Sequence, residues 1–135
     1  AGLNQLGMNE VPQTPIEVET MLPAVAQGAI GIERRVDDLR VAQMLKAIHD
    51  VPTGQRLAAE RAFLAALDGS CETPIAGLAI LQGGDIYLRG EVLRPDGSEV
   101  IEEALRCPIE DGAAAGREMA ATLLGKAGDG FFDWR

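Results

Sequence analysis

Two stretches in the first half of the chain repeat apolar residues at the spacing of an amphipathic helix. Residues 36–49 predict the first helix. Residues 54–67 predict the second, with the Thr53 hydroxyl as its N-cap and Asp68-Gly69 as its end. The apolar face of the first helix consists of Val36, Leu39, Met44, Leu45 and Ile48.

From residue 75 the apolar positions alternate with a period of two, which is typical of strands. Gly83-Gly84 and the turn at 94–97 interrupt this pattern, and a further helical pattern follows it. The segment thus predicts an α+β unit, with a three-stranded antiparallel sheet that carries helices on one face. The predicted strands are residues 75–81, 85–93 and 99–107, and the last helix is residues 111–125.

The first 35 residues have weaker patterns. Residues 1–10 resemble the end of a helix that Gly7 closes, so the chain begins as if within a longer protein. Residues 16–22 alternate apolar and acidic side chains, which favours a half-buried strand. Residues 29–33 favour a short buried strand among small residues.

Composition and charge narrow the classes of partner. The 135 residues suffice for one core, and no stretch approaches the roughly 18 apolar residues of a membrane span. The net charge of −9 without a basic stripe disfavours nucleic acid and anionic membranes as partners. The two cysteines lack the spacing of a metal site or a disulfide framework, so a cytoplasmic location is expected and no metal is predicted.

A cysteine in a tight turn is the most unusual local feature. Cys71 stands between a predicted helix end and a predicted buried strand, with Gly69 before it and Pro74 after it. Rigid flanks of this kind suit covalent attachment of a group to the thiol. The alternative is a small buried thiol, which is the commonest state of a free cysteine and is what we expect for Cys107.

Three segments together resemble hydroxymethylbilane synthase, the porphobilinogen deaminase family. They are LPAVAQGAIGIERR (22–35), LAAERAFLAALDGSCETPIAGLA (57–79) and LRPDGSEV (93–100), and AGLNQLG at the start also resembles a family helix. The order and spacing fit the family without gaps through Cys71. The sequence departs from the family at Ser70, where the family has a second glycine, and at Gln5, where it has an arginine that helps to hold pyrrole carboxylates.

The resemblance implies a specific chemistry. In the family, the cysteine at the position of Cys71 carries a dipyrromethane cofactor through a thioether. Four porphobilinogen units are added to the cofactor with release of ammonia, and hydroxymethylbilane is then released by hydrolysis on the way to haem. The resemblance places Gln27 and Gly28 along the cofactor cleft and Arg35 near it, where a guanidinium can bind carboxylates. It suggests a structural role for Arg61, tying its helix to the turn before Cys71.

The resemblance also predicts how the chain is divided. Residues 1–22 would end domain two, residues 23–50 would return to domain one as its last strand and helix, and residues 51–135 would form the C-terminal domain. Both earlier domains would be α/β units, represented here only by their tail ends. The catalytic aspartate would lie in the missing N-terminal half, so no catalytic residue is assigned in this chain.

Partners and rival functions follow from this division. The expected partners are porphobilinogen, its pyrrole intermediates and the missing N-terminal half, in a monomeric parent protein. Apolar faces made for absent domains predict that the isolated chain self-associates. Two alternatives remain open: a folded module without activity of its own, and a small α+β interaction domain that uses an acidic face and the aromatic tail. That tail, with Phe131, Phe132 and Trp134, is expected to dock on the last helix.

Overall fold

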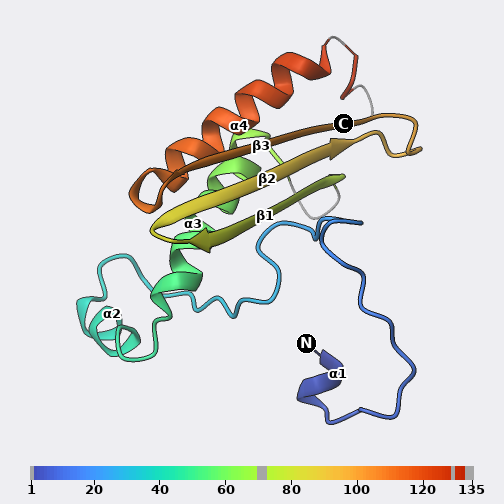
Figure 1. The fold of residues 1–135 in the computed structure, drawn as a ribbon. Coiled ribbons are helices and arrows are strands. Elements are labelled where there is room, and N and C mark those ends of the chain that lie inside the picture. The colour runs from blue at the N-terminus through green and yellow to red at the C-terminus, as the bar shows by residue number, and fades with distance from the viewer. Residues whose placement is uncertain (1, 70–72, 129, 133–135) are drawn as a thin grey trace.

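The computed structural model of the chain describes residues 2–69, 73–128 and 130–132. Three strands form one open antiparallel sheet in the order β1-β2-β3, which confirms the predicted α+β class (Figure 1). Both hairpins have the predicted pairing, with Leu81 opposite Ile86 in the first and Ile86 opposite Cys107 in the second. The strands are β1 Ile75–Gln82, β2 Asp85–Leu93 and β3 Val100–Pro108.

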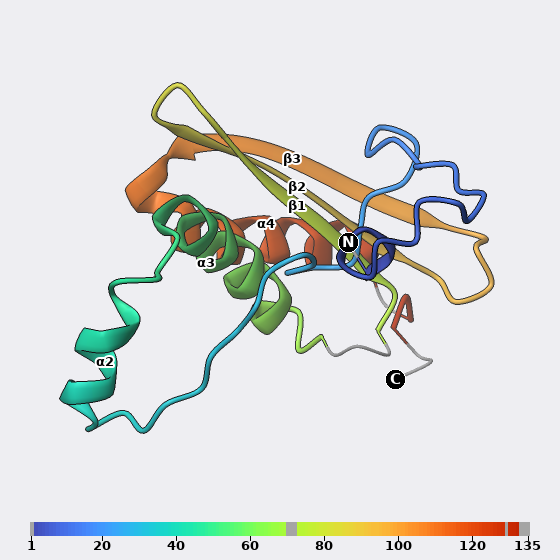
Figure 2. The same cartoon turned by 90° about the horizontal axis from the view of Figure 1, so that it is seen from below.

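The two long helices lie side by side on one face of this sheet (Figures 1 and 2). They are α3, Val51–Ala66, and α4, Gly112–Ala127, which follows a short 3-10 turn at Ile109–Asp111. This arrangement confirms the predicted layer of helices. The two short helices, α1 (Gly2–Gln5) and α2 (Leu39–Leu45), lie away from the sheet.

The core lies between the sheet and the helix pair. Ile86, Leu88 and Val92 of β2 are fully buried, as their period-two spacing predicts, and Tyr87, Arg89 and Glu91 face the other side of the sheet. The β1–β2 hairpin turns at Gly83 and Gly84, whose φ values of 61° and 97° suit a type I′ turn. The helices complete the core with the fully buried side chains Phe63, Leu67, Met119 and Leu123.

Helices α3 and α4 approach each other closely because a glycine stands at their crossing. A Cβ on Gly116 would lie 2.3 Å from the carbonyl oxygen of Ala59 and 2.9 Å from the backbone nitrogen of Phe63. Both neighbours are main-chain atoms, so only a residue without a side chain fits at this point. The whole helix layer therefore depends on Gly116.

Two predicted strands do not form. Residues 16–22 contain a turn at 18–20, and only Leu22 is buried there. Residues 29–33 are irregular and mostly exposed, with Ile30 94% exposed. The physical reason is the same in both cases, since a strand needs a neighbour for its backbone N–H and C=O groups, and the described residues offer none beside these segments.

The helix boundaries also differ from the sequence prediction. The helix predicted at 36–49 is shortened to α2, which Asp38 caps by accepting the N–H of Val41 at 2.8 Å. The N-cap predicted at Thr53 is wrong. Asp50 is the cap of α3 and accepts the N–H of Thr53 at 2.8 Å, so the helix begins at Val51 with proline in its first turn.

The predicted apolar face around α2 is present but uncovered. Val36, Leu39 and Ile48 are 90%, 78% and 70% exposed. Exposed apolar side chains that lie together are typical of an interaction site. Self-association of the chain through this face stays a prediction. None of the helices in the described part of the chain is long and apolar enough to cross a membrane.

Candidate functional site

The turn that carries Cys71 is anchored at both ends. Cys71 itself lies outside the described residues, between Gly69 and Thr73. Before it, helix α3 ends at Ala66, Asp68 follows with a φ of 53°, and the N–H of Gly69 donates to the carbonyl of Leu64 at 3.0 Å. This is the hydrogen-bonded closure of a helix C-terminus, and it fixes the direction in which the chain leaves α3.

Gly69 is closely surrounded by two side chains. A Cβ there would lie 2.5 Å from Cδ1 of Leu64 and 2.7 Å from Cδ1 of Ile75. The end of α3 and the start of β1 thus pack directly against each other beside the turn. The φ of Gly69 is not positive, so what the structure shows at this glycine is close side-chain packing and not unusual backbone freedom.

After the turn, Pro74 and Ile75 tie the chain to the sheet. The carbonyl of Pro74 accepts the N–H of Leu93 at 3.0 Å, and Ile75 is buried with 6% exposure. Residues 70–72 therefore connect two fixed points, one on a helix end and one on a strand.

A second turn carries Gln27 and Gly28. Both residues are exposed, and Gly28 has a φ of 75° with nothing within 4 Å of a built Cβ. The residues before this turn are attached to β1. The carbonyl of Pro23 accepts the N–H of Gly77 at 3.0 Å, and Ala24 forms a bridge with Ala76. The structure thus joins this turn to the strand that follows the Cys71 turn.

A buried carboxylate, which the sequence analysis missed, secures the second turn. Glu60 of α3 is 6% exposed, and its two oxygens accept the N–H groups of Ala26 and Ala79, each at 2.8 Å. One signal could have revealed it. Glu60 stands three and seven residues before Phe63 and Leu67, on the buried stripe of the helix, where an unpaired charge would be costly.

Arg35 lies apart from these two turns, in an exposed segment before α2. Its carbonyl accepts hydrogen bonds from the guanidinium of Arg34 at 2.8 Å and from the N–H of Asp38 at 3.2 Å. Arg61, the other arginine singled out, is exposed, and its Nη2 lies 3.9 Å from the position of a Cβ on Gly31. Arg61 therefore reaches toward the segment after the Gln27–Gly28 turn, and its predicted tie to the Cys71 turn stays a prediction.

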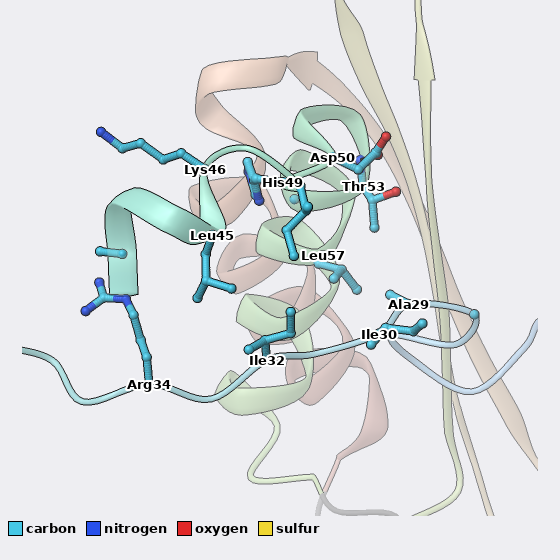
Figure 3. A pocket seen from close by; sticks show the side chains of 14 residues that line it. Ala29, Ile30, Ile32, Arg34, Leu45, Lys46, His49, Asp50, Thr53 and Leu57 are labelled. Carbon is cyan, nitrogen blue, oxygen red and sulfur yellow. The ribbon is translucent and has the colours of Figure 1, made fainter. Parts of the chain in front are cut away.

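An apolar hollow of about 640 Å³ lies between α2, α3 and residues 28–34. Figure 3 shows Ile32, Leu45 and Leu57 around this space, whereas Lys46 points away from it. Gly28 and Arg34 also line the hollow, but Gln27 and Arg35 do not. Its lining is mainly apolar but also includes Arg34, Lys46 and His49.

The remaining candidate groups show no arrangement for catalysis. His49 is exposed, and its ring lies 2.9 Å from the position of a Cβ on Gly54, so it packs against the start of α3. Burial, followed by the nearby charges of Asp111 and Asp85, raises the pKa of the Cys107 thiol, as expected for a packed cysteine. The residues that the structure describes contain no group of three or more metal-binding side chains.

Comparison with known proteins agrees with these motifs. Residues 55–125 match the family model described as porphobilinogen deaminase, C-terminal domain. Residues 1–43 match the model described as porphobilinogen deaminase, dipyromethane cofactor binding domain. Together the two models cover both the Gln27–Gly28 turn and the Cys71 turn.

Curated relatives align with nearly the whole chain. It is 59% identical over 99% of its length to porphobilinogen deaminase of Paracoccus denitrificans, and 46% identical over 98% to that of Nitrobacter hamburgensis. The chain spans only 43% and 42% of these two relatives. By the two family models and these identities, the chain belongs to the porphobilinogen deaminase family and corresponds to less than half of the length of its relatives.

Proposed function

We propose that this chain is the C-terminal part of a hydroxymethylbilane synthase and carries the cofactor of that enzyme on Cys71. The complete enzyme would condense four porphobilinogen units onto a dipyrromethane, release one ammonia for each unit and then release hydroxymethylbilane. The observation that supports this most is the cysteine turn. Both of its ends are fixed, and it stands at the family spacing from the Gln27–Gly28 turn.

The proposed work of Cys71 is to hold a covalent group in one place. A thioether survives repeated acid-assisted condensation, and the described residues on either side, Gly69 and Pro74, are held by packing and by a hydrogen bond to the sheet. When bound, the dipyrromethane supplies the pyrrole carbon to which the first substrate unit is joined. This chain's residues hold and orient it, and they supply no acid or base for the condensation.

The Gln27–Gly28 turn suits the polar side groups of a pyrrole. The Gln27 side chain is exposed, and no atom occupies the space where Gly28 lacks a Cβ. A pyrrole that carries acetate and propionate can therefore approach the backbone at this turn. Arg35 is proposed to bind one of these carboxylates, because its guanidinium is exposed and forms the planar, two-pronged donor that a carboxylate prefers.

The rest of the site would come from the portion of the relatives that this chain does not span. That portion is proposed to supply the catalytic aspartate and further cationic residues, and to cover the apolar face around α2. The partners of this chain are thus porphobilinogen, its pyrrole intermediates and the N-terminal half of the same protein. The complete protein is proposed to be a cytoplasmic monomer.

Intact-protein mass tests the attachment. The full-length polypeptide, purified after expression in cells that make porphobilinogen, should carry the mass of a dipyrromethane. Cys71→Ser should abolish this mass and the turnover of porphobilinogen. Cys107→Ser is the matched control, and it should keep both because Cys107 packs at the end of β3. An unmodified, inactive wild-type protein would contradict the proposal.

The second candidate function, a module without activity of its own, concerns the 135-residue chain alone. The exposed face around α2 favours it, because this face lacks the cover that a complete enzyme would provide. The chain alone should release no ammonia from porphobilinogen. Turnover by this chain, free of any longer species, would exclude the candidate.

A further inference from the structure

We infer that Glu60 is a positioning residue, whose carboxylate fixes the Gln27–Gly28 turn against the C-terminal sheet. The inference rests on the proposed function, because that function gives the turn its role beside the cofactor. Glu60 itself has no place at the surface of the site, since it is only 6% exposed. It acts through the backbone of the turn.

The geometry of the carboxylate links three segments. One oxygen accepts the N–H of Ala26, which immediately precedes Gln27, and the other accepts the N–H of Ala79 in the middle of β1. Both distances are 2.8 Å, in the range of strong charge-assisted hydrogen bonds. Helix α3, strand β1 and the turn thus share one side chain.

Alternative anchors stop short of the turn. The bonds of Pro23 and Ala24 to β1 end two residues before Ala26. Val25 packs against the core, but among the residues that the structure describes, the Glu60 bond is the only side-chain hydrogen bond that reaches residues 26–28. Glu60 therefore helps to set the direction in which Gln27 leaves the sheet.

The backbone of Ala26 shows that this conformation is imposed. Its φ of 63° lies in the left-handed region, which a residue with a Cβ seldom adopts unless its surroundings hold it there. In this conformation the Ala26 N–H points to the carboxylate. Packing alone could have been provided by an apolar side chain, which avoids the desolvation of a buried charge. A carboxylate that directs two N–H groups explains why an acid is placed here.

Glu60→Gln in the full-length enzyme separates positioning from folding. The glutamine keeps the shape of the side chain, but only one of its two ends can accept an N–H. We expect kcat for porphobilinogen to fall about tenfold or more with KM within about twofold, because the turn is misplaced by a fraction of an ångström while the substrate contacts of the other domains persist. Glu99→Gln is the control. It removes an exposed carboxylate, paired with Arg94, and should leave both constants unchanged.

Hydrogen exchange of the Glu60→Gln variant tests the position of the turn without relying on enzyme activity. In Glu60→Gln, exchange should accelerate in a peptide spanning residues 24–28 and stay unchanged in a peptide spanning β2. Unaltered exchange at 24–28, faster exchange throughout the sheet, or a loss of folding would overturn the inference. So would a kcat equal to that of the wild type. If the wild-type protein neither binds dipyrromethane nor turns over porphobilinogen, the proposed function fails, whereas the exchange result still decides whether Glu60 holds the turn.

Discussion

The crossing of α3 and α4 offers the sharpest test of the fold, because the two helices can approach this closely only where Gly116 has no Cβ. Gly116→Ala adds a methyl group where Ala59 O lies 2.3 Å away, far inside the 3.0 Å below which a Cβ contact is essentially never found. The carbonyl belongs to the backbone of α3, so the clash cannot be relieved by turning a side chain. Gly125→Ala changes the same helix at a position where nothing lies within 4 Å.

The two substitutions have opposite expected effects on the free energy of unfolding. Alanine in a helix is favoured over glycine by about 0.5–1 kcal/mol, which should stabilise the Gly125 variant. At Gly116 the same gain is outweighed, because forcing extra volume into a packed interface costs about 1–3 kcal/mol or more. Because the helix gain is common to both variants, they should differ by the packing cost alone, about 1–3 kcal/mol or more, which is a large part of the stability of a small domain.

Urea unfolding of the 135-residue chain, followed by far-UV circular dichroism, measures this difference. The unfolding midpoint of Gly116→Ala should lie below that of the wild type, and the midpoint of Gly125→Ala should equal or exceed it. The slope of free energy against urea should be shared, since the surface exposed on unfolding is the same. If both variants unfold at the same urea concentration, the close approach of the two helices is refuted.

Three other predictions concern the tail, an ion pair and a thiol. Phe131 is fully buried and Phe132 only partly, so Phe131→Ala should cost about 3–5 kcal/mol in thermal or urea unfolding and Phe132→Ala clearly less; a loss for Phe131→Ala as small as that of an exposed residue would show that the tail is not docked. The hydrogen bond from Lys126 is the main cause that lowers the pKa of Glu103, so this pair stabilises the fold above the ordinary carboxyl pKa and ceases to do so as pH falls through the lowered value. Lys126→Gln should raise the Glu103 pKa in an NMR titration, and an unchanged titration would contradict the pairing. Because burial raises the pKa of Cys107, its alkylation by iodoacetamide at pH 8 should be slower in the folded chain than in urea, and equal rates would contradict this.

The C-terminal sheet could be predicted from the sequence because its information is local. Alternating apolar residues in β2 indicate which face of the strand is buried, and Gly83-Gly84 indicates where the hairpin turns. The family motif around Cys71 is likewise a continuous stretch of sequence, so it could be recognised without the fold. The ends of its turn were foreseen from Gly69 and Pro74, although only the structure shows that Gly69 makes room for Leu64 and Ile75.

The strands expected at residues 16–22 and 29–33 do not form, for a reason that cannot be read from the sequence. An apolar pattern shows that a segment can be covered, but the cover must come from elsewhere, and among the described residues Leu22 is the only buried one in these two segments. The helix expected at 36–49 was shortened in the same way, since its apolar face has no surface to pack on.

What the sequence by itself determined is thus the three-stranded sheet, the family of the chain and the position of Cys71 between the end of a helix and the start of a strand. Only the tertiary structure showed that Glu60 ties the second turn to this unit. Its two hydrogen-bond partners, Ala26 and Ala79, stand 34 and 19 residues away along the chain, and both donate from the backbone, which carries no side-chain identity. A contact between a side chain and distant main-chain groups leaves no pattern in the sequence, because any residue type except proline could supply the donor.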